Sequence, residues 1–188
     1  MAGNSASSSW LRLARIALIT PAALLAEPSL AAPVGLTITA DTPLRFGAFV
    51  VVANGSRTVS ASGAVTNSGI FPVNSAPVGP GQFTVTYDRG NNNPHVLTVT
   101  FQLLLGGVAP VNQAGVTGSL SGFVSDLPGA SVLVPGRAVN YTMPNCAART
   151  CSVTFRIGAR IDVTRASGGA SLTIALPVTA TLISAERL

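Results

Sequence analysis

Strict alternation of apolar and polar residues over residues 151–163 constrains the fold of this chain more than any other feature. A period of two places successive side chains on opposite faces of an extended strand, whereas a helix requires a period of 3.6. The stretch therefore predicts a long β-strand with one buried face and one face in water. Its apolar positions are Cys151, Val153, Phe155, Ile157, Ala159, Ile161 and Val163.

The same alternation predicts further strands over residues 44–52, 83–87, 97–103 and 172–182. In the first of them, the residues expected to share one face are Leu44, Phe46, Ala48, Val50 and Val52. Between residues 87 and 97 lies a strong turn signal, Arg89-Gly90-Asn91-Asn92-Asn93-Pro94, so we expect the second and third of these runs to form a hairpin.

Composition supports an all-β fold. The chain has no Lys and only two Glu, whereas Val, Thr, Ser and Gly, which favour strands and turns, are abundant. Roughly seven to ten strands with Gly and Pro turns predict an antiparallel, Ig-like or pilin-like β-sandwich. The residues expected to form its single core are Phe46, Phe83, Val99, Phe101, Phe155, Ile157, Leu172 and Ile174.

The N-terminus has the pattern of a cleaved signal peptide. Arg12 and Arg15 precede an apolar stretch of about 11 residues, which is too short to span a bilayer. Small residues at Ser29 and Ala31 indicate cleavage after Ala31. We therefore expect residues 1–31 to be a signal peptide and residues 32–188 to be a single exported domain without a membrane span, located in the periplasm, at the cell surface or outside the cell.

The two cysteines, Cys146 and Cys151, are close in sequence. Export would bring them into an oxidising compartment, so we expect them to form a disulfide rather than a metal or redox pair. A metal site would need more ligands than the single His95 offers, and a redox pair usually has two residues between its cysteines. Because Cys146 alternates with the polar Asn140 and Thr142, we expect Pro144 to end the regular pairing or to force a bulge.

Residues that carry catalysis are scarce. Without Lys the chain has neither a phosphate-loop lysine nor a Schiff base, and His95 borders a turn, where we expect it to be exposed. The carboxylates are isolated in sequence, so we expect no catalytic, cofactor or metal site. After residue 31 nine Arg face five acids, a net charge of 9 − 5 = +4, and these charges are scattered. We therefore expect no nucleic-acid binding.

Several short motifs resemble one known family. Leu44-Arg45-Phe46-Gly47 is similar to an opening L-x-F-G strand, and Thr58-Val59 followed by Gly63 to a T-V-x-x-x-G stretch. Residues 156–163 resemble a later x-V-G-x-x-L-x-V strand, with Ile161 in place of Leu, and residues 169–181 resemble the closing strand. These motifs are those of the DUF4402 family of secreted bacterial proteins. The resemblance implies an Ig-like sandwich similar to fimbrial and spore-coat-U-type subunits, but no assigned function.

Two functions follow as hypotheses. The first is a non-enzymatic structural subunit of the cell surface, pilin-like or coat-like, which has copies of itself and a periplasmic chaperone and usher as partners. The second is a secreted monomeric module that recognises a glycan or a protein through its loops. For the first, residues 34–40 could serve as a donor strand completing a neighbouring subunit, because Val34, Leu36, Ile38 and Ala40 alternate. The alternative is that they form the first strand of their own chain.

Overall fold

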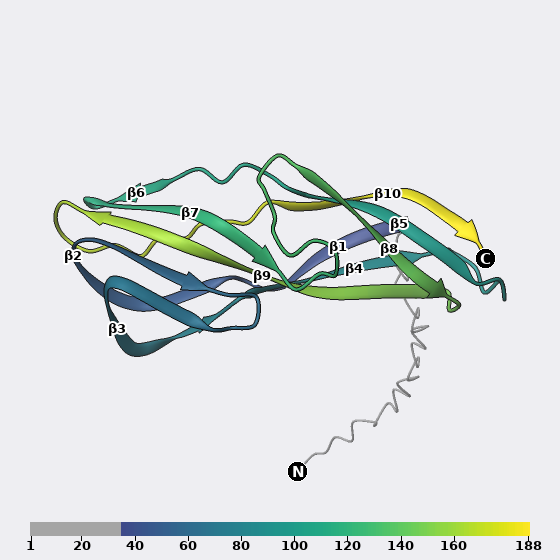
Figure 1. Cartoon of the computed structure of the whole chain (residues 1–188), viewed down its shortest axis with the longest axis horizontal. Helices are drawn as coiled ribbons and strands as arrows, with labels where there is room; N and C mark the ends of the chain where they lie inside the picture. Colours follow the sequence, from purple (N-terminus) through teal and green to yellow (C-terminus); the bar gives the residue numbers. More distant parts are fainter. Residues whose placement is uncertain (1–34) are drawn as a thin grey trace, which may run out of the picture. The chain divides into compact units, whose positions relative to one another are not determined.

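The computed structural model describes residues 35–188, which form ten β-strands joined by turns and irregular segments (Figure 1). The strands are β1 (Gly35–Thr42), β2 (Arg45–Val59), β3 (Val65–Gly79), β4 (Gly81–Asp88), β5 (Leu97–Leu105), β6 (Val111–Gln113), β7 (Val116–Ser125), β8 (Ala138–Cys146), β9 (Thr150–Arg165) and β10 (Val178–Arg187). This part of the chain has no helix of the length and hydropathy needed to cross a membrane. The signal peptide expected over residues 1–31 lies outside the described residues.

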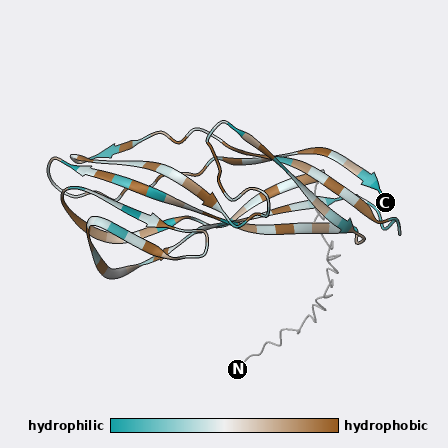
Figure 2. Ribbon diagram, in the orientation of Figure 1, coloured by the Kyte–Doolittle hydropathy of each residue, from teal (hydrophilic) through white to brown (hydrophobic). Residues whose placement is uncertain are grey.

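The strands form two antiparallel sheets. The larger has the order β1-β4-β9-β2-β3, with β7 also paired to β9 and β6 paired to β7, and the smaller has the order β10-β5-β8. Apolar and polar residues alternate along the strands (Figure 2), and the apolar faces of the two sheets meet in a common core. The fold is therefore the antiparallel β-sandwich that the alternation predicts.

Strand β9 is the centre of the larger sheet. It is 16 residues long, and three strands share its two edges. Its first half pairs with β4, and its second half pairs with β2 and β7. The face assignment from the sequence is confirmed, since Phe155, Ile157 and Ile161 are buried.

The hairpin expected between residues 83 and 103 is absent, and that prediction was wrong. Strand β4 belongs to the larger sheet and β5 to the smaller one, so residues 89–96 cross from one sheet to the other. Both strands still direct their apolar faces, with Phe83 and Phe101, into the same core, but from opposite sides. Within the crossing, Arg89 donates hydrogen bonds to the carbonyl oxygens of Asn93 (2.9 Å) and His95 (2.7 Å). His95 itself is exposed, as expected.

The buried residues form two clusters instead of the single core predicted. The larger lies between the sheets and contains most of the expected residues, among them Phe101 and Phe155. The smaller consists of Val51, Ile70, Val116, Ile161 and Val163. Leu172 and Ile174 pack against this second cluster, and Phe46 contacts both. The split arises because β9 extends beyond the three-stranded sheet, so its second half needs a separate apolar cover.

The strand expected over residues 172–182 begins only at Val178. Residues 171–178 keep the alternating burial that the sequence predicts, but residues 171–177 belong to no sheet. The N–H of Gly106, which follows β5, donates to the carbonyl oxygen of Pro177, which precedes β10 (2.7 Å). This is the last backbone hydrogen bond between the two segments before they diverge. Pro177 has no N–H with which to extend the ladder. The sequence predicts the extended conformation here but not the missing neighbour.

Candidate functional site

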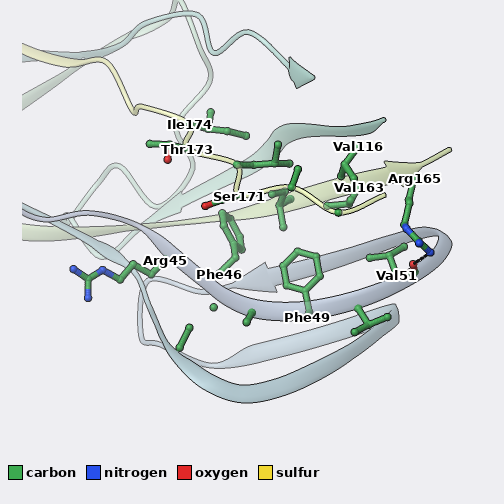
Figure 3. A pocket seen from close by; sticks show the side chains of 18 of the residues that line it. Arg45, Phe46, Phe49, Val51, Val116, Val163, Arg165, Ser171, Thr173 and Ile174 are labelled. Carbon is green, nitrogen blue, oxygen red and sulfur yellow. Dashed lines mark hydrogen bonds between the residues drawn. The ribbon is translucent and has the colours of Figure 1, made fainter. Parts of the chain in front are cut away.

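An apolar cleft of about 810 Å³ opens beside the second cluster. Residues 45–51 of β2 form one border, and residues 168–174 form the other (Figure 3). Between them lies a floor from β7 and β9, to which Val116, Leu120, Ile161 and Val163 contribute. A cleft of this volume is within the range of small-molecule and peptide sites.

A bulge at Gly47 determines which side chains of β2 face the cleft. Gly47 has a φ of 70°, and the register with β3 shifts between Phe46 and Ala48. The shift reverses the faces of the following residues. Val51 is therefore buried, while Val50 and Val52 are 52% and 72% exposed. The expectation that Val50 and Val52 share the buried face of Phe46 was wrong for this reason. Figure 3 shows Phe46 and Phe49 projecting between the two borders.

Arg165, the last residue of β9, connects the two borders at one end of the cleft. Its Nε donates to the carbonyl oxygen of Gly168 (2.6 Å), and its Nη1 donates to that of Val51 (3.4 Å). The dashed line in Figure 3 marks the bond to Val51. Arg165 thus fixes the spacing of the borders at this end and brings a positive charge there. Arg45 is the other charged residue of the lining, and its side chain points away from the cavity (Figure 3).

A third cation, Arg57, is buried near the cleft. It is 7% exposed and lies against the ring of Phe49, with 6.0 Å between Cζ and the ring centroid. Among the described residues no acid pairs with it, and its Nε has no hydrogen-bond partner. The contact with the ring face of Phe49 partly compensates the charge. The surroundings of the cleft are therefore apolar and positively charged.

Strand β1 holds the proposed donor residues. Leu36, Ile38 and Ala40 pair with Tyr87, Val85 and Phe83 of β4 in the same chain, and Leu36 and Ile38 contact the larger cluster. Val34 lies outside the described residues. The structure thus places residues 35–42 at the edge of their own sheet, with β4 as their neighbour.

Asp41, near the end of β1, has its pKa lowered by hydrogen bonds. The strongest comes from the hydroxyl of Thr84, whose Oγ1 donates to the carboxylate at 2.6 Å. The side chains of Gln82 and Thr39 donate as well. The carboxylate is exposed and charged at neutral pH, so the end of β1 carries a negative charge.

Cys146 and Cys151 lie at disulfide distance, with 5.7 Å between their Cα atoms. They connect the end of β8, in the smaller sheet, to the start of β9, in the larger one. The bulge expected near Pro144 is present: the register with β5 shifts after Met143, and Asn145 has a φ of 59°. The shift moves Cys146 onto the buried face, where it is 2% exposed. The pair therefore links the two sheets.

A stripe of apolar side chains covers the outer face of the β2–β3 ribbon. Val50 pairs directly with Phe71, and Val73 is two residues further along β3, opposite Ala48. Val52 is two residues beyond Val50 on β2, where the register with β3 begins to shift. We call these four residues the ribbon stripe. All four are exposed, Phe71 to 61%.

Sequence reasoning missed both the cleft and the ribbon stripe. Val50 and Val52 were expected on the buried face because the alternation was read straight through Gly47, and the other apolar residues of the cleft and the stripe were expected in a core or left unassigned. A glycine inside an alternating run is a known sign of a bulge, and it was the signal that could have revealed the change of face.

Comparison with known proteins identifies one family. A family model described as a domain of unknown function, DUF4402, matches residues 36–185. The match extends over nearly all of the described residues. No curated protein and no solved structure matches the chain.

Proposed function

We propose that this chain, which belongs to the DUF4402 family, is a non-enzymatic structural subunit that is exported and assembles with copies of itself at the bacterial cell surface. The observation that carries the proposal is the ribbon stripe. Its four residues are neighbours on one face of one ribbon and are all exposed. Contiguous apolar patches on a protein surface usually mark contacts with other molecules.

The composition of the stripe suits a contact between protein chains. It contains one aromatic and three branched aliphatic side chains and no charge, which is typical of the centre of a protein–protein interface. A periplasmic chaperone that covers the stripe before assembly belongs to the same proposal.

The cysteine pair supports export. A cysteine pair at disulfide distance that links two sheets fits an oxidising compartment. Intact mass of the protein recovered from the periplasm or the medium tests this part. We expect a chain that begins at Ala32, and a mass that includes residues 1–31 would contradict cleavage.

Assembly is tested by substitution within the stripe. We expect the purified protein to form large species in sedimentation velocity and the Phe71→Ser variant to remain monomeric. The matched control is Val132→Ser, because Val132 is 62% exposed but lies outside the stripe. Circular dichroism and the urea midpoint show whether both variants keep the fold.

The opposite outcome favours the second function. A wild-type protein that stays monomeric over its whole soluble concentration range would overturn the subunit proposal. The apolar, positively charged cleft would then favour a secreted binding module, although one that uses the cleft rather than the loops. A Phe71→Ser variant that assembles like the wild type would show that the stripe is not the contact.

A further inference from the structure

The cleft has the features of a vacant strand position. Residues 45–51 of β2 pair with β3 on one side only, so their other edge is without a ladder in the described chain. Across the cleft, the backbone N–H groups of residues 169–176 donate to no other group among residues 35–188. Two extended segments with free backbone groups thus border an apolar floor.

Such an arrangement suits a particular class of ligand. An extended peptide between the borders would satisfy backbone groups on both sides, and its alternate side chains would contact the floor. A compact small molecule would fill the apolar volume but would form few hydrogen bonds with the backbone of the two borders. The backbone evidence therefore favours a β-strand as the occupant.

We propose that the cleft accepts the β1 strand, Gly35–Thr42, of a second copy of the chain. The inference rests on the proposed function, because it assumes that copies meet. It adds a contact that the ribbon stripe does not provide, since the exposed side chains of the stripe lie on the outer face of the β2–β3 ribbon, and of the four stripe residues only Val50 also belongs to the lining of the cleft.

The length and pattern of β1 match the site. β1 has 8 residues, close to the length of the free edge formed by residues 45–51. Leu36, Ile38 and Ala40 alternate with Thr37 and Thr39, so one face of the strand is apolar and can lie on the floor.

The charges also match. The lining of the cleft contains no acid, Arg165 lies at one end of it, and the buried Arg57 lies nearby, whereas the side chain of Arg45 points away from the cavity. β1 contributes one charge, that of Asp41 at its end. A carboxylate placed near Arg165 would interact favourably with the cation that closes the cleft.

The number of ladders favours the exchange. In its own chain β1 is an edge strand that pairs only with β4, and residues 39–42 are exposed. In the cleft it would lie between two borders and could form a ladder with each. The donor copy loses the pairing with β4 and the contacts of Leu36 and Ile38, so the second ladder must offset that loss.

A synthetic peptide with the sequence of residues 35–42, labelled with a fluorophore, tests the site on the purified full chain. We expect saturable binding by fluorescence anisotropy. Replacing Ile38 of the peptide by Asp should abolish binding, because the carboxylate would face the apolar floor. Asp41→Asn in the peptide should weaken binding by about threefold, the size of an exposed ion pair.

Two variants of the chain locate the bound peptide. Ser171→Trp places a large ring in the cleft, whereas Ala175→Trp, the control, lies in the same exposed segment outside the lining. We expect S171W to weaken binding by about tenfold or more and A175W to leave it unchanged. Equal binding to S171W and the wild type would place the peptide elsewhere, for example beside β4, and overturn the proposal. No binding to any form would also overturn it.

The result is separable from the test of the subunit function. The monomeric Phe71→Ser variant should still bind the peptide, because Phe71 does not line the cleft. Assembly through the stripe without peptide binding would reject the strand acceptor and keep the subunit. Peptide binding to a protein that never assembles would support the acceptor site and reject the second copy as its source.

Discussion

Asp88, the last residue of β4, accepts a hydrogen bond of 3.1 Å from Nε of Arg149, which lies between β8 and β9. Asp88 is where the connection from β4 to β5 begins, and Arg149 lies in the connection from β8 to β9, so the bond joins the two crossings between the sheets. Arg89, next to Asp88, reinforces the link by donating to the carbonyl oxygen of Cys146. Both crossings at this end of the sandwich are therefore held together by one polar network next to the cysteine pair.

The Asp88 interaction predicts a loss of stability in acid. The Arg149 side chain, and after it the backbone N–H of Gly90, lower the pKa of Asp88 below its ordinary value of 3.8. Because the folded-state pKa is below the unfolded one, the stabilisation is complete above the unfolded pKa and is lost as the pH falls through the folded pKa. Urea unfolding should show a wild-type advantage over Asp88→Asn that is constant between about pH 5 and 7 and shrinks below about pH 4. The pKa of Asp41 is also lowered, but Asp41 is present in both the wild type and the Asp88→Asn variant, so its effect cancels in the difference between their stabilities. An advantage that persists undiminished at about pH 2 would contradict the assignment.

The Cys146–Cys151 bond should stabilise the domain by about 2 kcal/mol, the chain-entropy value for so short a loop. Non-reducing peptide mapping should recover the linked pair, and a Cys146→Ser, Cys151→Ser double variant should unfold at lower urea. Dithiothreitol should shift the wild type toward the double variant and leave that variant unchanged. Two free thiols in the exported protein would refute the pairing.

Truncation of the larger cluster should be costly. Phe101 and Phe155 are 0% and 1% exposed, so replacing either by Ala should lower the free energy of unfolding by about 3–5 kcal/mol. Phe71→Ala is the matched control, because the same change on the exposed stripe should cost less than about 1 kcal/mol. Similar urea midpoints for all three variants would show that the faces are assigned incorrectly.

The reversal of faces at Gly47 can be tested with two neighbouring valines. Val51→Thr buries a hydroxyl in the second cluster and should destabilise the protein by about 1–3 kcal/mol. Val52→Thr changes an exposed side chain and should stay within about 0.5 kcal/mol of the wild type. If Val52→Thr were the more destabilising of the two substitutions in chemical denaturation, the alternation would continue through Gly47 and the reversal of faces would be wrong.

Gly158 should not tolerate a side chain. A Cβ at this position of β9 would clash with the carbonyl oxygen of Val59 and lie 2.5 Å from the carbonyl carbon of Ser60 and 2.7 Å from the nitrogen of Ala61. These are backbone atoms of the turn at the tip of the β2–β3 ribbon, so the ribbon would have to move. Gly158→Ala should cost about 1–3 kcal/mol or more in thermal or urea unfolding, whereas Gly107→Ala, which meets nothing within 4 Å, should be tolerated.

The sequence allowed prediction of strands and most of their faces, because period-two alternation reports local burial directly. Over β9 the predicted face agrees with the structure from Phe155 to Val163. Which strands pair with one another was harder to predict from the sequence. Phe83 and Phe101 carry the same pattern whether their strands lie side by side or across a core, so the crossing between sheets was mistaken for a hairpin.

The cleft could not be predicted for a related reason. It depends on where residues 168–174 pass relative to β2, which no local pattern encodes. Alternation at Leu172 and Ile174 indicated burial correctly, but it could not show that the backbone between them lacks a neighbour. Only the glycine at position 47 gave a local warning, and it concerned the face of β2 rather than the gap beside it.

The position of β9 in the chain has a consequence for how the protein folds. The strand that joins β4, β2 and β7 into one sheet comes after all three in sequence, so the sheet depends on contacts between distant residues. Folds of high contact order form slowly, and their partly folded states expose unpaired strand edges. Until residues 150–165 join the fold, the β2–β3 ribbon and the β4 edge remain without their central strand. Purified chains truncated before Thr150 should therefore be open to proteases along β2 and β4, and protection should appear only in chains that include the whole of β9.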